Sequence, residues 1–246
     1  MASKSKIEWT EATWNPSTGC NKVSAGCKNC YAETMSKRLK AMGTKGYENG
    51  FEFTLMPERV DMPLKIKKPT KFFVNSMSDL FHEKMPFDFL DSVFETIKNT
   101  PQHTYQILTK REEILVDYFK NRNVPKNAWL GVSVENQKTK NRIDALRKVN
   151  AHIRFLSLEP LLEDLAVLDL TDIDWAIVGG ESGHKARPMK KDWAINIQKQ
   201  CKEQGTAFFF KQWGTWGADG VKRSKKANGR KLLGQEWNEE PLPVTA

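Results

Sequence analysis

Short runs of β-branched and aromatic residues alternate with longer amphipathic segments along most of the chain. This alternation is typical of repeated β-α units, in which helices connect the strands of a largely parallel sheet. We expect strands at residues 72–74, 105–108, 129–132, 153–156, 175–178 and 207–210, and one more strand just before Cys20. The pattern suits a doubly wound sheet or a barrel. We predict an α/β fold with an incomplete parallel β/α barrel of about six to seven strands.

Helices are expected between these strands, at residues 31–42, 89–99, 112–119, 138–149 and 193–204. Gly43 and Gly205 stand where two of these helices should end. Residues 44–69 interrupt the alternation with several glycines and prolines, so they should form a long connection. We therefore predict one barrel domain over residues 1–216 and a basic C-terminal tail or flap over residues 217–246.

The composition is that of a folded protein, since hydrophobic residues make up 39% and charged residues 28% of the 246 residues. No run of about 18 apolar residues occurs, and the N-terminus lacks the apolar stretch of a secretory signal. We expect a cytoplasmic protein with no membrane partner. The formal net charge of +9 agrees with a nucleic-acid partner, but also with lysine-rich helix faces in solvent, because the lysines are spread along the chain.

Three of the four cysteines lie within eleven residues, as Cys20, Cys27 and Cys30, in a C-x6-C-x2-C pattern directly before a predicted helix. Clustered thiols in a chain with few other cysteines favour a metal site over disulfides. Soft thiolates suit an iron–sulfur cluster or zinc. Structural zinc usually takes four protein ligands, yet no fourth Cys or His lies nearby, and Cys201 is far downstream. Three ligands would leave one metal position open.

An open iron position is what radical S-adenosylmethionine (SAM) chemistry requires, because the amino and carboxylate groups of SAM chelate that iron and the cluster delivers the electron that cleaves the sulfonium. We therefore predict a [4Fe-4S] cluster on the three cysteines, with SAM as the second cofactor and an external electron donor as a partner. The alternatives are structural zinc completed by a distant side chain, and core cysteines without any metal. The spacing differs from the commoner C-x3-C-x2-C pattern of radical-SAM enzymes.

Polar residues follow the predicted strands at the ends where the active site of a parallel β/α barrel lies. They are Asn75, Ser76, Ser78, Asp79, Thr109, Lys110, Arg111, Ser133, Glu135, Asn136, Ser157, Glu159, Gly179, Gly180, Glu181, Ser182, Lys211 and Gln212. Polar ends on successive strands predict a polar site that faces the cysteine loop. Each carboxylate could instead cap a helix or pair with a lysine.

Residues 179–183, with the sequence Gly-Gly-Glu-Ser-Gly, follow an apolar strand. The glycines would let backbone N–H groups approach a carboxylate, ribose or phosphate closely, or they could simply form a tight turn. His184 and Arg187 lie next to this segment and are further candidates for substrate contact.

The same stretches resemble the phage Gp37/Gp68-type family of unknown function, which belongs to the three-Cys-motif, radical-SAM-like group. The resemblance runs from Ile7 to Trp216 and covers most of the chain. The matching blocks are residues 7–10 (IEWT), 14–16 (WNP), 18–20 (TGC), 26–33 (GCKNCYAE), 75–82 (NSMSDLFH), 108–111 (LTKR), 131–136 (GVSVEN), 157–160 (SLEP), 179–183 (GGESG) and 209–214 (FFKQWG). So many blocks in order identify the chain as a member of this family.

The resemblance implies an incomplete parallel β/α barrel, a cluster on the three cysteines and SAM across the strand ends. It also implies a protein partner, because members of this group are often encoded beside a three-Cys-motif protein. It carries over no reaction and no substrate. The phage-type origin suggests nucleic acid or a nucleotide as the substrate by association only.

The predicted function is reductive cleavage of SAM to start radical chemistry on an unidentified substrate. Cofactor contacts are expected from Asn75, Ser76, Ser133, Glu135, Gly179, Gly180 and Glu181, and catalytic or substrate contacts from Lys110, Arg111, Glu159, Lys211 and Gln212. Two other functions stay open. One is a zinc-stabilised nucleic-acid-binding protein without catalytic activity, and the other is a degenerate barrel that acts only as a partner protein.

Overall fold

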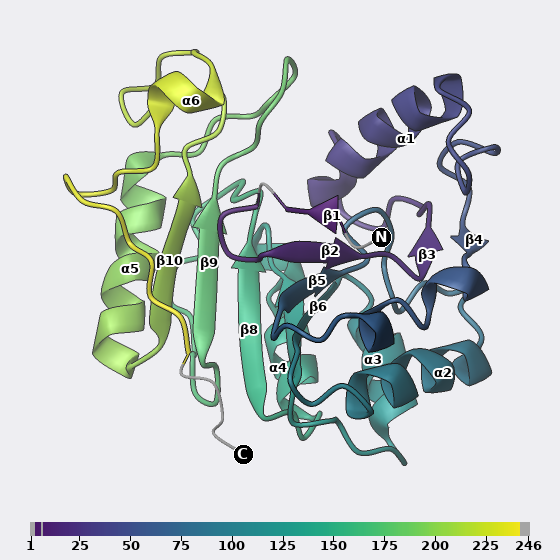
Figure 1. Cartoon of the computed structure of the whole chain (residues 1–246). Coiled ribbons are helices and arrows are strands. Elements are labelled where there is room, and N and C mark those ends of the chain that lie inside the picture. The colour runs from purple at the N-terminus through teal and green to yellow at the C-terminus, as the bar shows by residue number, and fades with distance from the viewer. Residues whose placement is uncertain (1–2, 6, 242–246) are drawn as a thin grey trace. The chain divides into compact units, whose positions relative to one another are not determined.

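A computed structural model describes residues 3–5 and 7–241 (Figure 1). The chain forms two compact units. Unit 1 contains the described residues up to Val23, Cys30–Gly131 and Lys148–His152. Unit 2 contains Ser24–Asn29, Val132–Arg147 and the described residues from Ile153 onward. The loop between Cys20 and Cys30 is therefore divided, and its middle part belongs to unit 2.

The described strands of the main sheet have the order β1-β2-β5-β6-β7-β8-β9-β10. Their bounds are Ser3–Lys4 (β1), Ala12–Trp14 (β2), Lys71–Val74 (β5), Thr104–Thr109 (β6), Ala128–Ser133 (β7), Ile153–Leu158 (β8), Trp175–Gly179 (β9) and Ala207–Gln212 (β10). The short edge strand β1 is antiparallel to β2. A second, two-stranded sheet pairs β3 (Ser17–Thr18) with β4 (Thr54–Leu55).

The fold-class prediction is confirmed. Within the described residues, seven strands, β2 and β5 to β10, make up the parallel part of the sheet, and β1 and β10 remain its two edges, so the barrel is incomplete. In unit 1, β2 pairs in parallel with β5, and β5 with β6. In unit 2, β8 pairs in parallel with β9, and β9 with β10. Because parallel strands end at the same edge, the polar residues that follow neighbouring strands are brought close together within each unit.

The helices of unit 1 are α1 (Tyr31–Ala41), α2 (Phe87–Lys98) and α3 (Glu112–Phe119), with short 3-10 turns at Pro57–Arg59 (η2) and Pro63–Lys65 (η3). Helix α2 buries Leu90, Val93, Phe94 and Ile97, which recur at the spacing of one helical face. This face meets α3 in an aromatic cluster, where the rings of Phe94 and Tyr118 lie 5.3 Å apart and those of Phe81 and Phe94 lie 6.4 Å apart. The cluster fixes the segment that follows β5.

The helices of unit 2 are α4 (Asn141–Arg147), α5 (Lys191–Gln204) and α6 (Lys225–Asn228), with 3-10 turns at Ala25–Cys27 (η1) and Gln137–Thr139 (η4). Strands β8 and β9 are almost completely buried, and α5 packs along β10 (Figure 1). Helix α5 ends at Gly205, which has a φ of 75°, as its position in the sequence indicates. The predicted helix at residues 138–149 is shorter, because a capping box at Asn136 starts the 3-10 turn η4 first.

The segment after β10 is ordered and packs on unit 2. Phe210 donates its backbone N–H to the carbonyl of Trp237 at 3.0 Å, and Trp175 donates its indole N–H to the carbonyl of Glu239 at 2.8 Å. Leu232 is fully buried. Helix α6 lies beyond the carboxyl end of β10 (Figure 1). Across the described part of the chain, none of the helices combines the length and the apolar character that a membrane crossing needs.

Replacing Phe81 by Ala should lower the free energy of unfolding by about 3 to 5 kcal/mol, because its fully buried ring would leave a cavity among the aromatic side chains of α2 and α3. Chemical denaturation followed by circular dichroism measures this. Met42→Ala, at a side chain that is 76% exposed in the same unit, is the control and should change stability little. Equal losses for both variants would contradict the packing described here.

Candidate functional site

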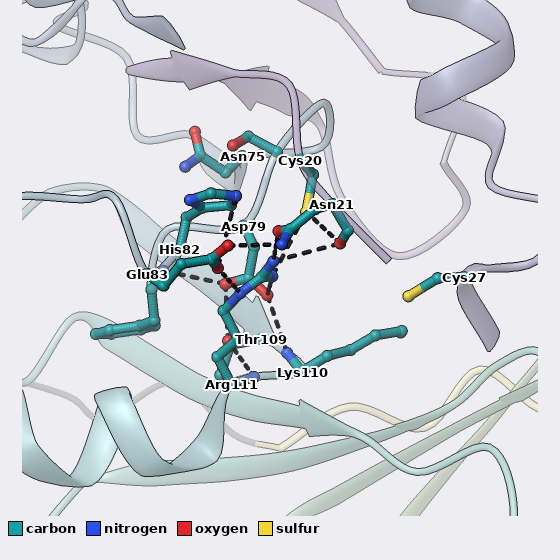
Figure 2. A network of polar contacts seen from close by, with 12 residues as sticks. Cys20, Asn21, Cys27, Asn75, Asp79, His82, Glu83, Thr109, Lys110 and Arg111 are labelled. Carbon is teal, nitrogen blue, oxygen red and sulfur yellow. Dashed lines mark hydrogen bonds and ion pairs between the residues drawn. The ribbon is translucent and has the colours of Figure 1, made fainter. Parts of the chain in front are cut away.

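In unit 1, Arg111 connects the end of β6 to the loop that contains Cys20 (Figure 2). Its Nη1 donates to Cys20 Sγ at 3.4 Å and to Asp79 Oδ2 at 3.0 Å, and its Nε donates to Glu83 Oε2 at 3.0 Å. Its Nη2 donates to the carbonyl and the side-chain oxygen of Asn21. Burial alone would lower the pKa of Arg111, but the charge of Asp79 together with the contacts to Cys20 and Glu83 outweighs it, and the pKa lies above its ordinary value. Arg111 thus holds a positive charge beside the Cys20 sulfur.

Asp79 holds the Arg111 side chain in place and is itself held by residues at the end of β6. Its Oδ1 accepts the Thr109 hydroxyl at 2.7 Å and its Oδ2 accepts the Lys110 backbone N–H at 3.1 Å. Thr109 Oγ1 in turn accepts the Arg111 backbone N–H at 2.9 Å. The Asp79 carboxylate is therefore almost fully satisfied by groups from the end of β6 (Figure 2). Both Lys110 and Arg111 were predicted as site residues. The side chain of Arg111 contacts the cysteine loop, whereas Lys110 contributes its backbone N–H to Asp79, which holds Arg111.

Asn75 and Ser76 occupy a turn directly after β5. Asn75 is buried, adopts a φ of 58°, and exchanges hydrogen bonds with Ser17 through both side-chain groups. The hydroxyl of Ser76 donates to Asn15 Oδ1 at 3.2 Å. These contacts tie β3 and its neighbours to the end of β5, so in the structure both predicted cofactor residues hold the first strands together.

A hollow of about 600 Å³ opens beside Cys20 in unit 1 and is lined by residues 20–21, 49, 51–53 and 82–84. Phe53 and His82 stack face to face within it, with ring centroids 4.1 Å apart. Burial, followed by the charge of Arg111, lowers the pKa of His82, so the ring is neutral at pH 7. The wall of the hollow thus combines an aromatic pair, Phe53 and His82, with the charged residues Glu52, Glu83 and Lys84 next to Cys20.

In unit 2, the fully buried Glu135, just after β7, binds the loop that contains Cys27. Its Oε1 accepts the Gly26 backbone N–H at 3.1 Å and the Ser24 hydroxyl, and its Oε2 accepts Arg142 Nη1 at 2.9 Å. Gly26 allows this approach, because a Cβ there would lie 2.7 Å from Glu135 Oε1. Arg142 on α4 neutralises the buried carboxylate.

Glu181, just after β9, binds the other side of the same loop. Its Oε2 accepts Asn29 Nδ2 at 3.0 Å, and Arg187 Nη2 donates to its Oε1 at 2.6 Å. Arg187 also donates through Nη1 to the carbonyl of Ala25 at 3.0 Å. Burial alone would raise the pKa of Glu181, but the hydrogen bonds and charge of Arg187 together with the hydrogen bond from Asn29 outweigh it and hold the pKa below its ordinary value. The loop is therefore held by two carboxylates, each paired with an arginine.

The ends of β8 and β10 bring three other predicted residues together. Lys211 Nζ lies 2.9 and 2.7 Å from the two carboxylate oxygens of Glu159, and Gln212 Nε2 donates to Glu159 Oε1 at 3.2 Å. The side chains of Lys211 and Glu159 remain 16% and 18% exposed, so they are accessible. The neighbouring Gly180 packs closely against the chain after β10. Only glycine fits there, because a Cβ would lie 2.0 Å from the carbonyl oxygen of Trp213.

Two buried polar atoms at the strand ends of unit 2 have no hydrogen-bond partner among the described residues. They are Ser133 Oγ, at the end of β7, and Gln212 Oε1, at the end of β10. A buried polar atom without a partner costs free energy, so its presence indicates a ligand or water that would complete it. Both residues are among those predicted from the sequence.

The three clustered cysteines fit an iron–sulfur cluster by their chemistry. None of the four cysteines forms a disulfide, and Cys20, Cys27 and Cys30 are all half-buried. The fourth cysteine, Cys201, is fully buried on α5, and this burial raises the pKa of its thiol to about 12. Among the described residues, no group of three or more His, Cys, Asp or Glu side chains is arranged to hold a metal ion.

Several residues of this network were not predicted from the sequence. They are Asn21, Ser24, Asn29, Glu83 and Arg142. Three of them, Asn21, Ser24 and Asn29, lie between the clustered cysteines, so their position could have indicated a role in holding the loop. Arg142 gives a weaker signal, as a charged residue on the helix that follows Glu135.

A family model described as protein of unknown function (DUF5131) matches residues 4–241. This agrees with the predicted membership in a family of unknown function, while the phage-type name stays a prediction. No curated protein matches the chain.

The chain is similar in fold to solved structures of mutants of spore photoproduct lyase. A mutant with serine in place of a cysteine has a TM-score of 0.51 at 17% identity. Two others, one with phenylalanine in place of a tyrosine and one with alanine in place of a cysteine, each have a TM-score of 0.50 at 16% identity. Each match covers 82% of this chain and 64% of the other. The chain therefore spans less than two thirds of the length of these structures, and the likeness concerns the fold.

Arg111→Gln should lower the free energy of unfolding by about 3 to 5 kcal/mol, because it leaves the buried carboxylate of Asp79 without its cation. Thermal and chemical denaturation measure the loss. The matched control is Arg122→Gln, which removes a more exposed ion pair with Asp91 in the same unit and should have little effect. Comparable losses in the two variants would show that Asp79 does not depend on Arg111.

Glu135→Ala should release the loop of Cys27, because Gly26 and Ser24 lose their acceptor and Arg142 loses its counter-charge. Hydrogen exchange followed by mass spectrometry should show faster exchange over residues 24–29 and little change in β8. Glu203→Ala, on the exposed side of α5, is the control. If residues 24–29 exchanged as slowly in Glu135→Ala as in the parent protein, Glu135 would not be what holds the loop.

Proposed function

We propose that this chain, which belongs to the DUF5131 family of proteins of unknown function, is a radical-SAM-type enzyme that holds an iron–sulfur cluster on Cys20, Cys27 and Cys30. The observation that carries the proposal is the attachment of the Cys27 loop. Two buried carboxylates, which follow parallel strands β7 and β9, hold this loop at the edge of the sheet where barrel enzymes place their active sites.

The fold supports the same proposal. The incomplete parallel barrel is shared with spore photoproduct lyase, which has the radical-SAM-like version of this fold. The three thiols lie on one short stretch of chain and no fourth cysteine or histidine lies in that stretch. A cluster with three protein ligands would keep one iron open to SAM and, once reduced, would supply the electron that cleaves the sulfonium.

The residues of the chain would have distinct tasks around these cofactors. Arg111 would place a fixed positive charge beside the Cys20 sulfur and favour its thiolate form. Glu135 and Glu181 would position the Cys27 loop rather than contact SAM directly. Ser133 Oγ, Gln212 Oε1 and the backbone at Gly179 and Gly180 remain to contact the bound SAM.

The pair of Lys211 and Glu159 is the strongest candidate for substrate contact. Each is partly exposed and neutralised by the other, so a polar substrate can exchange contacts with either without leaving a buried charge. Gln212 fixes the orientation of Glu159 through Nε2.

A nucleic acid or a nucleotide is the proposed substrate class. The proposed setting is the cytoplasm, where thiols stay reduced, with an external electron donor and a three-Cys-motif protein as partners.

The test is formation of 5′-deoxyadenosine and methionine from SAM by protein reconstituted with iron and sulfide without oxygen, with dithionite as the reductant. Liquid chromatography should detect both products. Cys27→Ala should lower them to the level of a protein-free sample, whereas Cys201→Ala should retain them, because that thiol is buried on α5 and is not part of the cysteine loop. Equal product in Cys27→Ala and the parent protein would refute the assignment.

Metal analysis of the same preparations addresses the second candidate, a zinc-stabilised nucleic-acid-binding protein. The positive net charge of +9 favours it. One zinc per chain after reconstitution, no iron and no 5′-deoxyadenosine would support this function and overturn the first.

A further inference from the structure

Most of the excess positive charge of the chain lies in two segments of unit 2. These are the loop between β9 and α5, residues 180–190, and the segment after β10 as far as residue 231. Together they contain nine Lys and Arg residues and two acidic residues, against 39 and 30 in the whole chain. The rest of the chain is nearly neutral, so the net charge of +9 is concentrated on this part of the molecule.

The two segments form one surface, because hydrogen bonds join them along their length. Gly183 donates its N–H to Thr215 Oγ1 at 2.9 Å, and Trp216 Nε1 donates to the carbonyl of Ala186 at 2.7 Å. Lys222 Nζ donates to the carbonyl of His184 at 2.9 Å. We call the surface of residues 180–190 and 213–231 the basic face.

The acidic residues of the basic face are both neutralised by its own arginines. Glu181 is buried against Arg187, and Asp219 pairs with Arg223 at 2.6 Å. The exposed cations are Lys185, Lys190, Lys222, Arg223, Lys225, Lys226 and Lys231. The surface therefore presents several cationic groups to solvent, and both of its acidic residues are paired.

The backbone of the basic face is ordered. Ser224 caps the start of helix α6, because its hydroxyl accepts the Ala227 backbone N–H at 3.2 Å. Asn228 Nδ2 donates to the carbonyls of Gly214 and Thr215, both at 3.0 Å. The half-buried ring of Trp216 lies 5.8 Å from Lys222 Nζ. Lysines on an ordered scaffold lose less freedom on binding than those on a flexible tail, and an aromatic ring among them can stack on a base.

We propose that the basic face binds a nucleic-acid strand through its phosphates. Nucleic-acid binding by this face does not require the proposed function. Only the further step, that the bound strand is the substrate, rests on it. Ammonium groups displace counterions from a phosphodiester backbone, which is the dominant source of affinity for nucleic acids. Among the described residues of the basic face, Val221 is the one large apolar side chain that is exposed, and a single residue does not make the apolar face that membrane-surface binding needs.

The test is the fluorescence anisotropy of a labelled oligonucleotide of about 20 nucleotides, single- and double-stranded, titrated with the full chain between about 50 and about 200 mM salt. The test variant is Lys185→Ala/Lys226→Ala/Lys231→Ala. The control is Lys138→Ala/Lys199→Ala/Lys202→Ala, which removes the same charge from exposed lysines of unit 2 outside the basic face.

The parent protein and the control should bind with a steep salt dependence. The test variant should bind at least about tenfold more weakly, and the slope of log affinity against log salt should fall by about 2 to 3, because each phosphate contact contributes about 0.7 to 0.9. Equal affinity and slope in the two triple variants would overturn the proposal. So would binding to phosphatidylserine vesicles in place of both oligonucleotides.

A variant without the three loop cysteines separates this proposal from the radical-SAM proposal. Nucleic-acid binding by Cys20→Ala/Cys27→Ala/Cys30→Ala would support the basic face even if no cluster forms in the parent protein. Cleavage of SAM by the parent protein without any binding of oligonucleotides would overturn the basic face alone and leave the enzyme proposal intact.

Discussion

The position of Cys27 depends on two carboxylates that are buried at the ends of β7 and β9. The loop of Ser24–Asn29 contributes no buried side chain of its own, so hydrogen bonds to Glu135 and Glu181 hold it. Burying a carboxylate is costly unless a cation and further donors satisfy it. Arg142 and Arg187 provide those cations, and the donors of the loop satisfy the remaining oxygen lone pairs. The loop and the two ion pairs therefore stabilise each other.

A buried carboxylate paired with an arginine occurs a third time in unit 1, where Asp79 holds Arg111 against the Cys20 loop. Most polar strand ends thus serve to support the cysteine loop. Glu159, Lys211 and Gln212 differ, because they contact one another and because Glu159 and Lys211 keep part of their surface accessible. Under the proposed function, the buried pairs would support the cofactor loop and the accessible group would contact the substrate.

The sequence predicted the parallel strands well, because strands such as β8 and β9 are dense apolar runs with polar residues directly after them. It did not predict how the polar residues pair. Glu181 meets Asn29 across 152 residues of chain, and no local pattern connects them. The lysines are spread along the chain, but the excess of basic over acidic residues is concentrated in residues 180–190 and 213–231. The two basic segments are far apart in the sequence. The hydrogen bonds of Thr215 with Gly183 and of Trp216 with Ala186 in the folded chain show that they form one surface.

The most direct test of the central claim is the iron content and the EPR spectrum of the reduced protein, reconstituted without oxygen, before and after addition of SAM. The reconstituted protein should contain about four irons per chain and give a cluster signal that changes when SAM binds the open iron. A protein that takes up no iron, or a cluster whose signal is indifferent to SAM, would contradict it.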